Sequence, residues 1–91
     1  MKDLIVDATA RHKPKPASNS YRWDEIGNYV VSTIRLSDAM AEAVVARYET
    51  LVYSCVEGAW DFDGSGVQSV TDAEADVAHA AACDRMRGRI Q

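Results

Sequence analysis

The stretch TDAEADVAHAAACDRMR, residues 71–87, decides the fold because it is the clearest helix in the chain. Thr71 followed three residues later by Glu74 fits a capping box, which satisfies the unpaired amides at the start of a helix. Acids at 72, 74 and 76 lie at the positive end of the helix dipole, and arginines at 85, 87 and 89 lie at the negative end. We therefore predict a helix over residues 73–87.

One face of this helix carries no Asp, Glu, Lys or Arg, so it is the expected buried face. It consists of Ala75, His79, Ala82, Cys83, Met86 and Ile90. Its small residues allow close packing on a sheet, with Ala82, Cys83 and Met86 facing that sheet. A histidine on such a face is more typical of a packed, hydrogen-bonded side chain than of a proton-transfer catalyst.

The segments before this helix read as strands and one short helix. Residues 28–36, NYVVSTIRL, are rich in β-branched side chains, and residues 47–56 alternate in the strand pattern. Between them, Ser37 is a suitable N-cap for a short helix over 37–46. A turn at 57–58 or 63–64 leads to a possible third strand at 67–70.

These elements predict an α+β fold. We expect a small antiparallel sheet of about three strands, with the C-terminal helix packed on one face and the short helix between the first two strands. A parallel pair is the alternative, although about ten residues are few for a right-handed crossover. Residues 1–20 hold both prolines and read as a flexible basic arm, followed by a single domain over 21–91. A homodimer is plausible, since a thin core gains from covering an open sheet edge.

The charge distribution points to a protein partner. The net charge is −4, and the segment from Tyr48 to Asp84 contains acids but neither Lys nor Arg. Such a surface repels nucleic acid and attracts basic surfaces. We predict a partner-binding surface formed by Glu57, Asp61, Asp63 and Asp76; the alternative is a solvated acidic face.

Residues 61–72 resemble the calcium loop of the EF-hand family. The positions that match its ligands are Asp61, Asp63, Ser65, Ser69 and Asp72, with Gly66 at the sharp turn. However, Gln68 stands where that family has an aliphatic residue, and a strand-like segment precedes the loop. We therefore predict no metal and no other cofactor, and keep a calcium site at Asp61, Asp63, Ser65 and Asp72 as the alternative.

Several classes of function find no support in the sequence. There is no signature of an activated nucleophile and no phosphate loop, so we do not predict an enzyme. No apolar run reaches the length of a membrane span, and the start lacks the features of a signal peptide, so we expect a cytoplasmic protein. Cys55 and Cys83 are expected as small buried residues, with a disulfide between them as the alternative, and no Cys/His motif suggests zinc.

Three runs of the chain resemble a group of small uncharacterised proteins encoded by bacteriophages. The runs are Val31-Ser32-Thr33-Ile34-Arg35-Leu36, Tyr48-Glu49-Thr50-Leu51-Val52-Tyr53, and the helix start with Thr71, Glu74, Ala75 and His79. That group has a V-S-T strand, an (F/Y)-E-T strand and an E-A-x-x-G-H step. Here Ala78 replaces the glycine of that step, and an alanine-rich helix replaces a Gly-rich loop.

The resemblance implies a phage protein that acts in the cytoplasm of a host cell. With the small size and the acidic surface, it predicts a protein that binds and inhibits a basic host protein, such as a CRISPR or other defence component. Two alternatives remain: a structural or assembly accessory protein of a phage, and a calcium- or small-ligand-binding module that uses the 61–72 loop.

Overall fold

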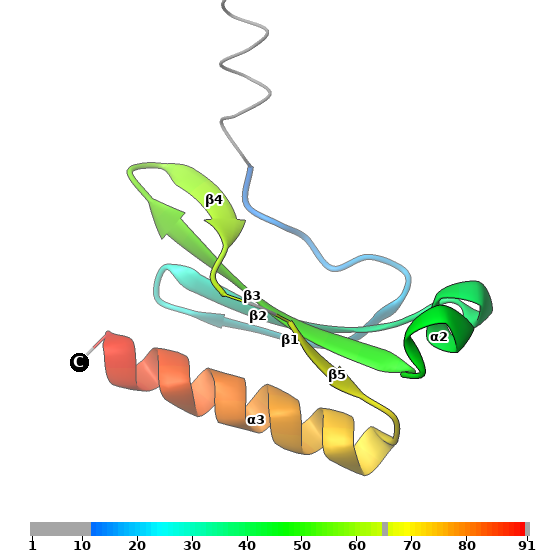
Figure 1. Ribbon diagram of the computed structural model, residues 1–91. Helices are drawn as coiled ribbons and strands as arrows, with labels where there is room; N and C mark the ends of the chain where they lie inside the picture. The colour runs from blue at the N-terminus through cyan, green and yellow to red at the C-terminus, as the bar shows by residue number, and fades with distance from the viewer. Residues whose placement is uncertain (1–11, 65, 91) are drawn as a thin grey trace, which may run out of the picture.

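In the described part of the chain, five strands form one antiparallel sheet, and a long C-terminal helix lies across one of its faces (Figure 1). The computed structural model describes residues 12–64 and 66–90. The strands are β1 (Ser20–Ile26), β2 (Tyr29–Arg35), β3 (Tyr48–Val56), β4 (Ala59–Phe62) and β5 (Val67–Ser69). The helices are α2 (Asp38–Val44) and α3 (Asp72–Arg89).

The strand order is β1-β2-β3-β4, and β5 pairs with the other end of β3. The central pair is β2 and β3, which run antiparallel and place Val31 opposite Val52 and Thr33 opposite Thr50. Both strands lie within one residue of the ranges that their β-branched and alternating patterns predict. The parallel alternative is wrong, because every pairing in the described sheet is antiparallel.

The predicted arrangement of the elements is wrong in two respects. The sheet has five strands instead of about three, and no helix lies between the first two strands. Instead β1 joins β2 through a tight turn at Gly27, whose φ of 59° suits glycine, and α2 lies between β2 and β3. Strand β1, SYRWDEI, is not predicted from the sequence. It lies at a half-exposed edge of the sheet, and its mixture of charged and aromatic residues lacks a strand pattern.

Helix α3 covers the apolar face of the sheet. Its capping box is confirmed: Thr71 accepts from the Glu74 amide, and the Glu74 carboxylate accepts from the Thr71 amide. The core that it closes consists of Ile26, Val31, Val52, Ala82, Cys83 and Met86. The predicted buried face is therefore confirmed except at Ile90, which is half exposed and lies over Gly27.

The segment before β1 runs along the side of the sheet away from α3 (Figure 1). Lys13 pairs with Glu25 and lies 5.9 Å from the centroid of the Trp60 ring. Asn19 continues the sheet edge, because its carbonyl accepts from the Arg35 amide at 2.8 Å. Of the predicted arm, residues 1–11 lie outside the described residues. Within the described ranges, no helix combines the length and apolarity needed to span a membrane.

Candidate functional site

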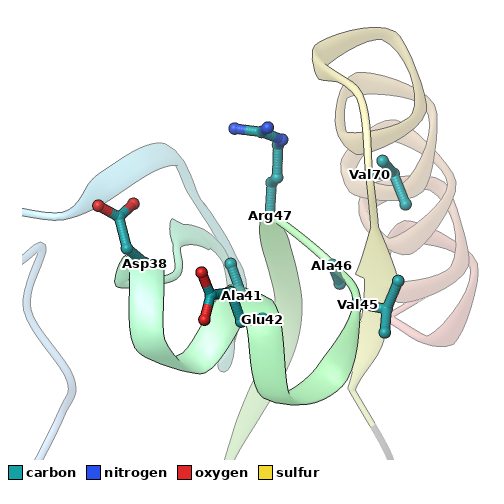
Figure 2. Close-up of a pocket in the computed structure, with 7 residues that line it drawn as sticks. All are labelled: Asp38, Ala41, Glu42, Val45, Ala46, Arg47 and Val70. Atoms are coloured by element: carbon teal, nitrogen blue, oxygen red, sulfur yellow. The ribbon is translucent and has the colours of Figure 1, made fainter.

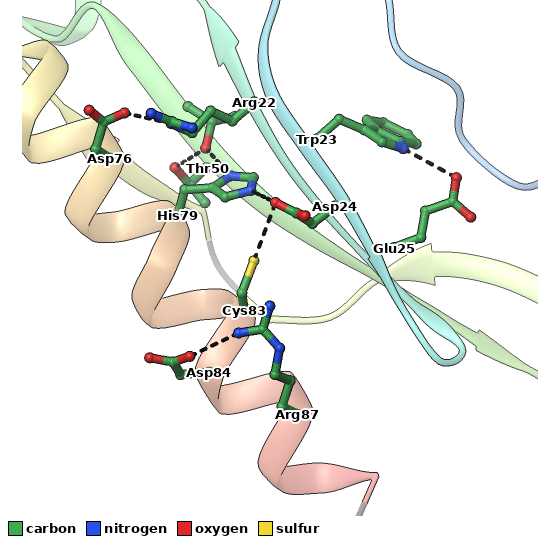
Figure 3. Close-up of polar contacts among 11 residues, drawn as sticks. Arg22, Trp23, Asp24, Glu25, Thr50, Asp76, His79, Cys83, Asp84 and Arg87 are labelled. Carbon is green, nitrogen blue, oxygen red and sulfur yellow. Dashed lines mark hydrogen bonds and ion pairs between the residues drawn. The ribbon is translucent and has the colours of Figure 1, made fainter.

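A buried polar network lies between α3 and the sheet, with His79 at its centre (Figure 3). The Nδ1 atom of His79 lies 2.8 Å from Thr33 Oγ1, which in turn lies 2.7 Å from Thr50 Oγ1. On the other side of the ring, Nε2 lies 2.8 Å from Asp24 Oδ2. His79 is therefore buried and hydrogen-bonded at both nitrogens, as its position on the helix predicts.

The sheet register places the partners of His79. Thr33 and Thr50 stand opposite each other on β2 and β3, and both are buried. Asp24 pairs with Val31 one strand further out, on β1. Thr33, Thr50 and His79 each come from a different one of the three runs that resemble the phage proteins. Those runs, far apart in the sequence, meet in this one network.

The hydrogen-bond directions in the network follow from its chemistry. An ionised carboxylate only accepts, so His79 Nε2–H donates to Asp24. In the neutral ring, Nδ1 then accepts from the Thr33 hydroxyl, and the Thr50 hydroxyl donates to Thr33 Oγ1. No buried side-chain nitrogen or oxygen of the described residues lacks a partner. Each member thus avoids the cost of burying an unpaired polar group.

Cys83 extends the site by one helical turn. Its Sγ lies 3.8 Å from Asp24 Oδ2, the same oxygen that binds His79. Burial raises the pKa of the Cys83 thiol, and the negative charge of Asp24 raises it further. The sulfur is therefore held as a protonated thiol, which is a poor nucleophile. Thr33 is fully buried, so its hydroxyl is out of reach of a substrate.

A groove of about 400 Å³ opens over this cluster. Two ion pairs flank it: Arg22 Nε lies 2.6 Å from Asp76 Oδ1, and Arg87 Nη1 lies 3.0 Å from Asp84 Oδ1. The Asp24 side chain is 51% exposed, whereas that of His79 is 4% exposed. Asp24 is therefore the point at which the buried network meets solvent.

The predicted partner-binding acids do not form one surface. Asp76 is paired with Arg22, and this hydrogen bond lowers the pKa of Asp76. Asp63 Oδ2 lies 2.5 Å from Arg89 Nη1 at the far end of α3. At 1.5 Å of rise per residue, residues 76 and 89 are separated by about 20 Å along the helix.

The other two predicted acids lie on the β3–β4 hairpin. Glu57 stands in its turn with φ 52°, and Asp61 lies in β4, where its Oδ1 accepts from the Phe62 amide at 2.8 Å. Glu57 and Asp61 are thus close in the fold, while Asp76 lies apart from them near the start of α3.

The residues of the calcium alternative are used in other contacts. The Tyr48 hydroxyl donates to the Asp72 carboxylate, and Asp63 binds Arg89. Strand β4 (Ala59–Phe62) leads into the loop and includes its first two positions, where an EF-hand has a helix before the loop. Ser65 lies outside the described residues. A cation would have to displace these partners, so the geometry gives the calcium alternative no support.

The two cysteines are free, so the disulfide alternative is wrong. Cys55 is half-buried on β3, and Cys83 is buried on α3. The cluster of Asp24, His79 and Cys83 has no counterpart in a sequence motif, because Asp24 lies 55 residues before His79. The one sequence signal for this cluster is the four-residue spacing of His79 and Cys83, which places both on one face of a helix.

A second feature is the corner formed by α2 and the residue after it, which we name the α2 corner (Figure 2). Helix α2 has Ser37 as its N-cap, as predicted, but none of its residues is buried. Val45 ends the helix in the left-handed region, with φ 55° and ψ 45°, and is 80% exposed. A hollow of about 380 Å³ there is lined by Asp38, Ala41, Glu42, Val45, Ala46, Arg47 and Val70.

No protein-family model, curated protein or solved structure matches this chain.

Proposed function

We propose that the protein is a non-enzymatic interaction protein that binds and inhibits a host protein through the α2 corner. The carrying observation is that α2 is an ordered helix without a buried residue. Helices in proteins owe most of their stability to packing of an apolar face, and a seven-residue helix is far too short to be stable alone. A partner that covers α2 supplies the missing packing.

The backbone at Val45 supports this assignment. A β-branched residue in the left-handed region is a genuine outlier, and such strain costs about 1–3 kcal/mol. Glycine is the usual residue at this place in a helix end. The chain instead presents an exposed valine on a strained turn, next to the exposed Val70. Exposed apolar side chains of this kind serve as contacts for a partner.

The charges around the hollow define the chemistry of that partner. Three charged side chains line it, Asp38, Glu42 and Arg47, so two acids face one base, and none of the three forms an ion pair with a described residue. By contrast, the acids predicted from the sequence at positions 63 and 76 are neutralised by arginines. We therefore move the acidic contact to α2. The partner is a protein with an apolar side chain surrounded by basic residues.

The resemblance to phage proteins supports a partner from the host, such as a CRISPR or other defence component, met in the host cytoplasm. The cluster around His79 supports the non-enzymatic part of the proposal, because its two threonine hydroxyls are buried out of reach of a substrate. Blocking requires only that the α2 corner occupy a surface that the host protein uses.

The test is affinity purification from a lysate of the host with wild-type protein and matched variants. Val45→Asp places a charge in the lining of the hollow, while Val56→Asp changes a valine that is 64% exposed at the opposite end of β3. We expect one host protein to be captured by the wild type and by Val56→Asp, and to be lost with Val45→Asp. Binding is then measured with that protein in pure form.

Two further variants check the physical argument. Val45→Gly relieves the backbone strain while removing the apolar contact, so it should resist urea at least as well as the wild type and still bind the partner more weakly. Glu42→Lys should slow association and reduce its dependence on salt. Capture of a phage structural protein, or equal binding by Val45→Asp and Val56→Asp, would contradict the proposal.

A further inference from the structure

We propose that Asp24, His79 and Cys83 form a binding site for Zn²⁺. Their three ligand atoms, Asp24 Oδ2, His79 Nε2 and Cys83 Sγ, all lie within 4.8 Å of one another. Asp24 Oδ2 lies 2.8 Å from Nε2 and 3.8 Å from Sγ. The three atoms are therefore grouped closely enough for one small cation to bind all of them after small side-chain movements.

The types and spacing of these atoms fit zinc. Zn²⁺ binds Cys sulfur at about 2.3 Å and His nitrogen or Asp oxygen at about 2.0–2.2 Å, in tetrahedral geometry. Those bond lengths place neighbouring ligand atoms roughly 3–4 Å apart. His79 and Cys83 are four residues apart on one face of α3, and Asp24 comes from β1. Small side-chain movements are enough to complete the coordination.

The buried threonines provide the support that a metal-binding histidine needs. A histidine ligand commonly donates its second ring N–H to a fixed acceptor, which sets the ring orientation. When Nε2 binds the cation, Nδ1–H donates to Thr33 Oγ1, and the Thr33 hydroxyl donates to Thr50 Oγ1. Because hydroxyls both donate and accept, the same contacts serve His79 with and without the metal.

The groove gives the cation an entrance and a fourth ligand. Asp24 lines the groove and is half exposed, so the open tetrahedral position faces solvent and takes a water molecule. Arg22 and Arg87 flank the groove, but Asp76 and Asp84 offset their charges. A thiol that coordinates zinc gives up its proton to the solvent. The burial of Cys83 is therefore compatible with its role as a ligand.

The experiment titrates the full, tag-free and reduced chain with Zn²⁺ in competition with a chromophoric chelator. We expect one equivalent to bind, and Cys83→Ser and Asp24→Asn each to weaken binding by at least about tenfold. Cys55→Ser is the matched control, because it removes the other free cysteine, and it should bind like the wild type. With Co²⁺ as the probe, the thiolate-to-cobalt charge-transfer band should vanish only in Cys83→Ser.

The proposal is overturned if one equivalent of Zn²⁺ does not bind, or if Cys83→Ser and Asp24→Asn bind like the wild type. It is also overturned if Cys55→Ser loses the site. Circular dichroism without metal establishes whether each variant folds. If Cys83→Ser does not fold, the zinc affinity of Asp24→Asn, at the exposed edge of the sheet, decides whether the proposal stands. Val45→Asp should leave the zinc affinity unchanged, which separates this site from the α2 corner.

Discussion

The hydroxyl groups of Thr33 and Thr50 contribute to the stability of this protein and to the packing of α3 on the sheet. Both are buried, and each bonds the other across the central strand pair while Thr33 also bonds His79. A buried hydroxyl that loses its partner keeps its desolvation penalty, which is about 1–3 kcal/mol. The network therefore sets the spacing between α3 and the sheet and penalises any change in register.

The first prediction concerns these hydroxyls. Thr33→Val keeps the shape but leaves His79 Nδ1 and the Thr50 hydroxyl short of a partner, so it should lower the free energy of unfolding by about 1–3 kcal/mol. The double variant Thr33→Val/Thr50→Val removes both hydroxyls and should lose less than the sum of the single losses. Urea unfolding of the wild type and the three variants measures this coupling. Additive losses would show that the threonines do not act as a unit.

At the scale of residues, the sequence predicts which side chains are buried better than it predicts which side chains contact one another. The position of His79 on a helix face without charged side chains is enough to predict that it is buried and hydrogen-bonded. Nothing in the sequence connects it to Asp24, because that contact depends on how β1 pairs with β2. The sequence likewise does not predict the left-handed backbone at Val45, since valine is among the residues least suited to that conformation.

Among the elements, α3 was the most predictable because its local signals agree with its packing. The capping box, the acidic first turn, the basic last turn and the apolar face all indicate the same helix. Strands β2 and β3 were predictable because their β-branched residues are buried in the middle of the sheet. By contrast β1 lies at an edge and β4 has four residues, so neither needs the alternation that marks a strand.

The capping box leads to a prediction about pH. Backbone hydrogen bonds from Thr71 and Val70 hold the pKa of the Glu74 carboxyl below its usual range. A carboxyl whose pKa is lower in the folded state stabilises the fold above its ordinary pKa of about 4.3, and this contribution is lost as the pH falls through the lowered value. The protein should therefore lose stability at α3 as the pH falls below about 4.

Glu74→Gln isolates this effect. The amide oxygen still accepts hydrogen bonds but does not titrate, so the unfolding free energy of Glu74→Gln should fall less steeply with acidification than that of the wild type. Urea unfolding across a series of acidic pH values measures both slopes. Glu57→Gln, in the exposed β3–β4 turn, is the control and should follow the wild-type slope. Equal slopes for all three proteins would contradict the role of Glu74.

At the scale of the whole molecule, stability depends on a thin core. Among the described residues, the largest fully buried side chains are Met86, Val30, Val31 and Thr33. Domains of this size bury a modest share of their surface, and native proteins retain only about 5–15 kcal/mol of net stability. A single core side chain therefore carries a large part of the total.

Met86 is the side chain that tests this view. Met86→Ala leaves a cavity between α3 and the sheet and should cost about 2–5 kcal/mol, which is enough to lower the thermal midpoint by many degrees. Val77→Ala truncates a side chain on the same helix that is 69% exposed, and it should have little effect. Thermal unfolding followed by circular dichroism compares the two. Similar midpoints for both variants would mean that the α3–sheet interface does not dominate stability.

The position of α3 in the chain has a consequence for biosynthesis. The ribosome makes the five described strands before it makes residues 72–89, and among the described elements it is that helix which closes over Ile26, Val31 and Val52. While the helix is still in the exit tunnel, the emerged sheet presents a bare apolar surface to the solvent, the kind of surface that nascent-chain chaperones bind. Maturation of this domain therefore waits for translation of its final helix, and the interval between the two is when the polypeptide is most exposed to aggregation and proteolysis.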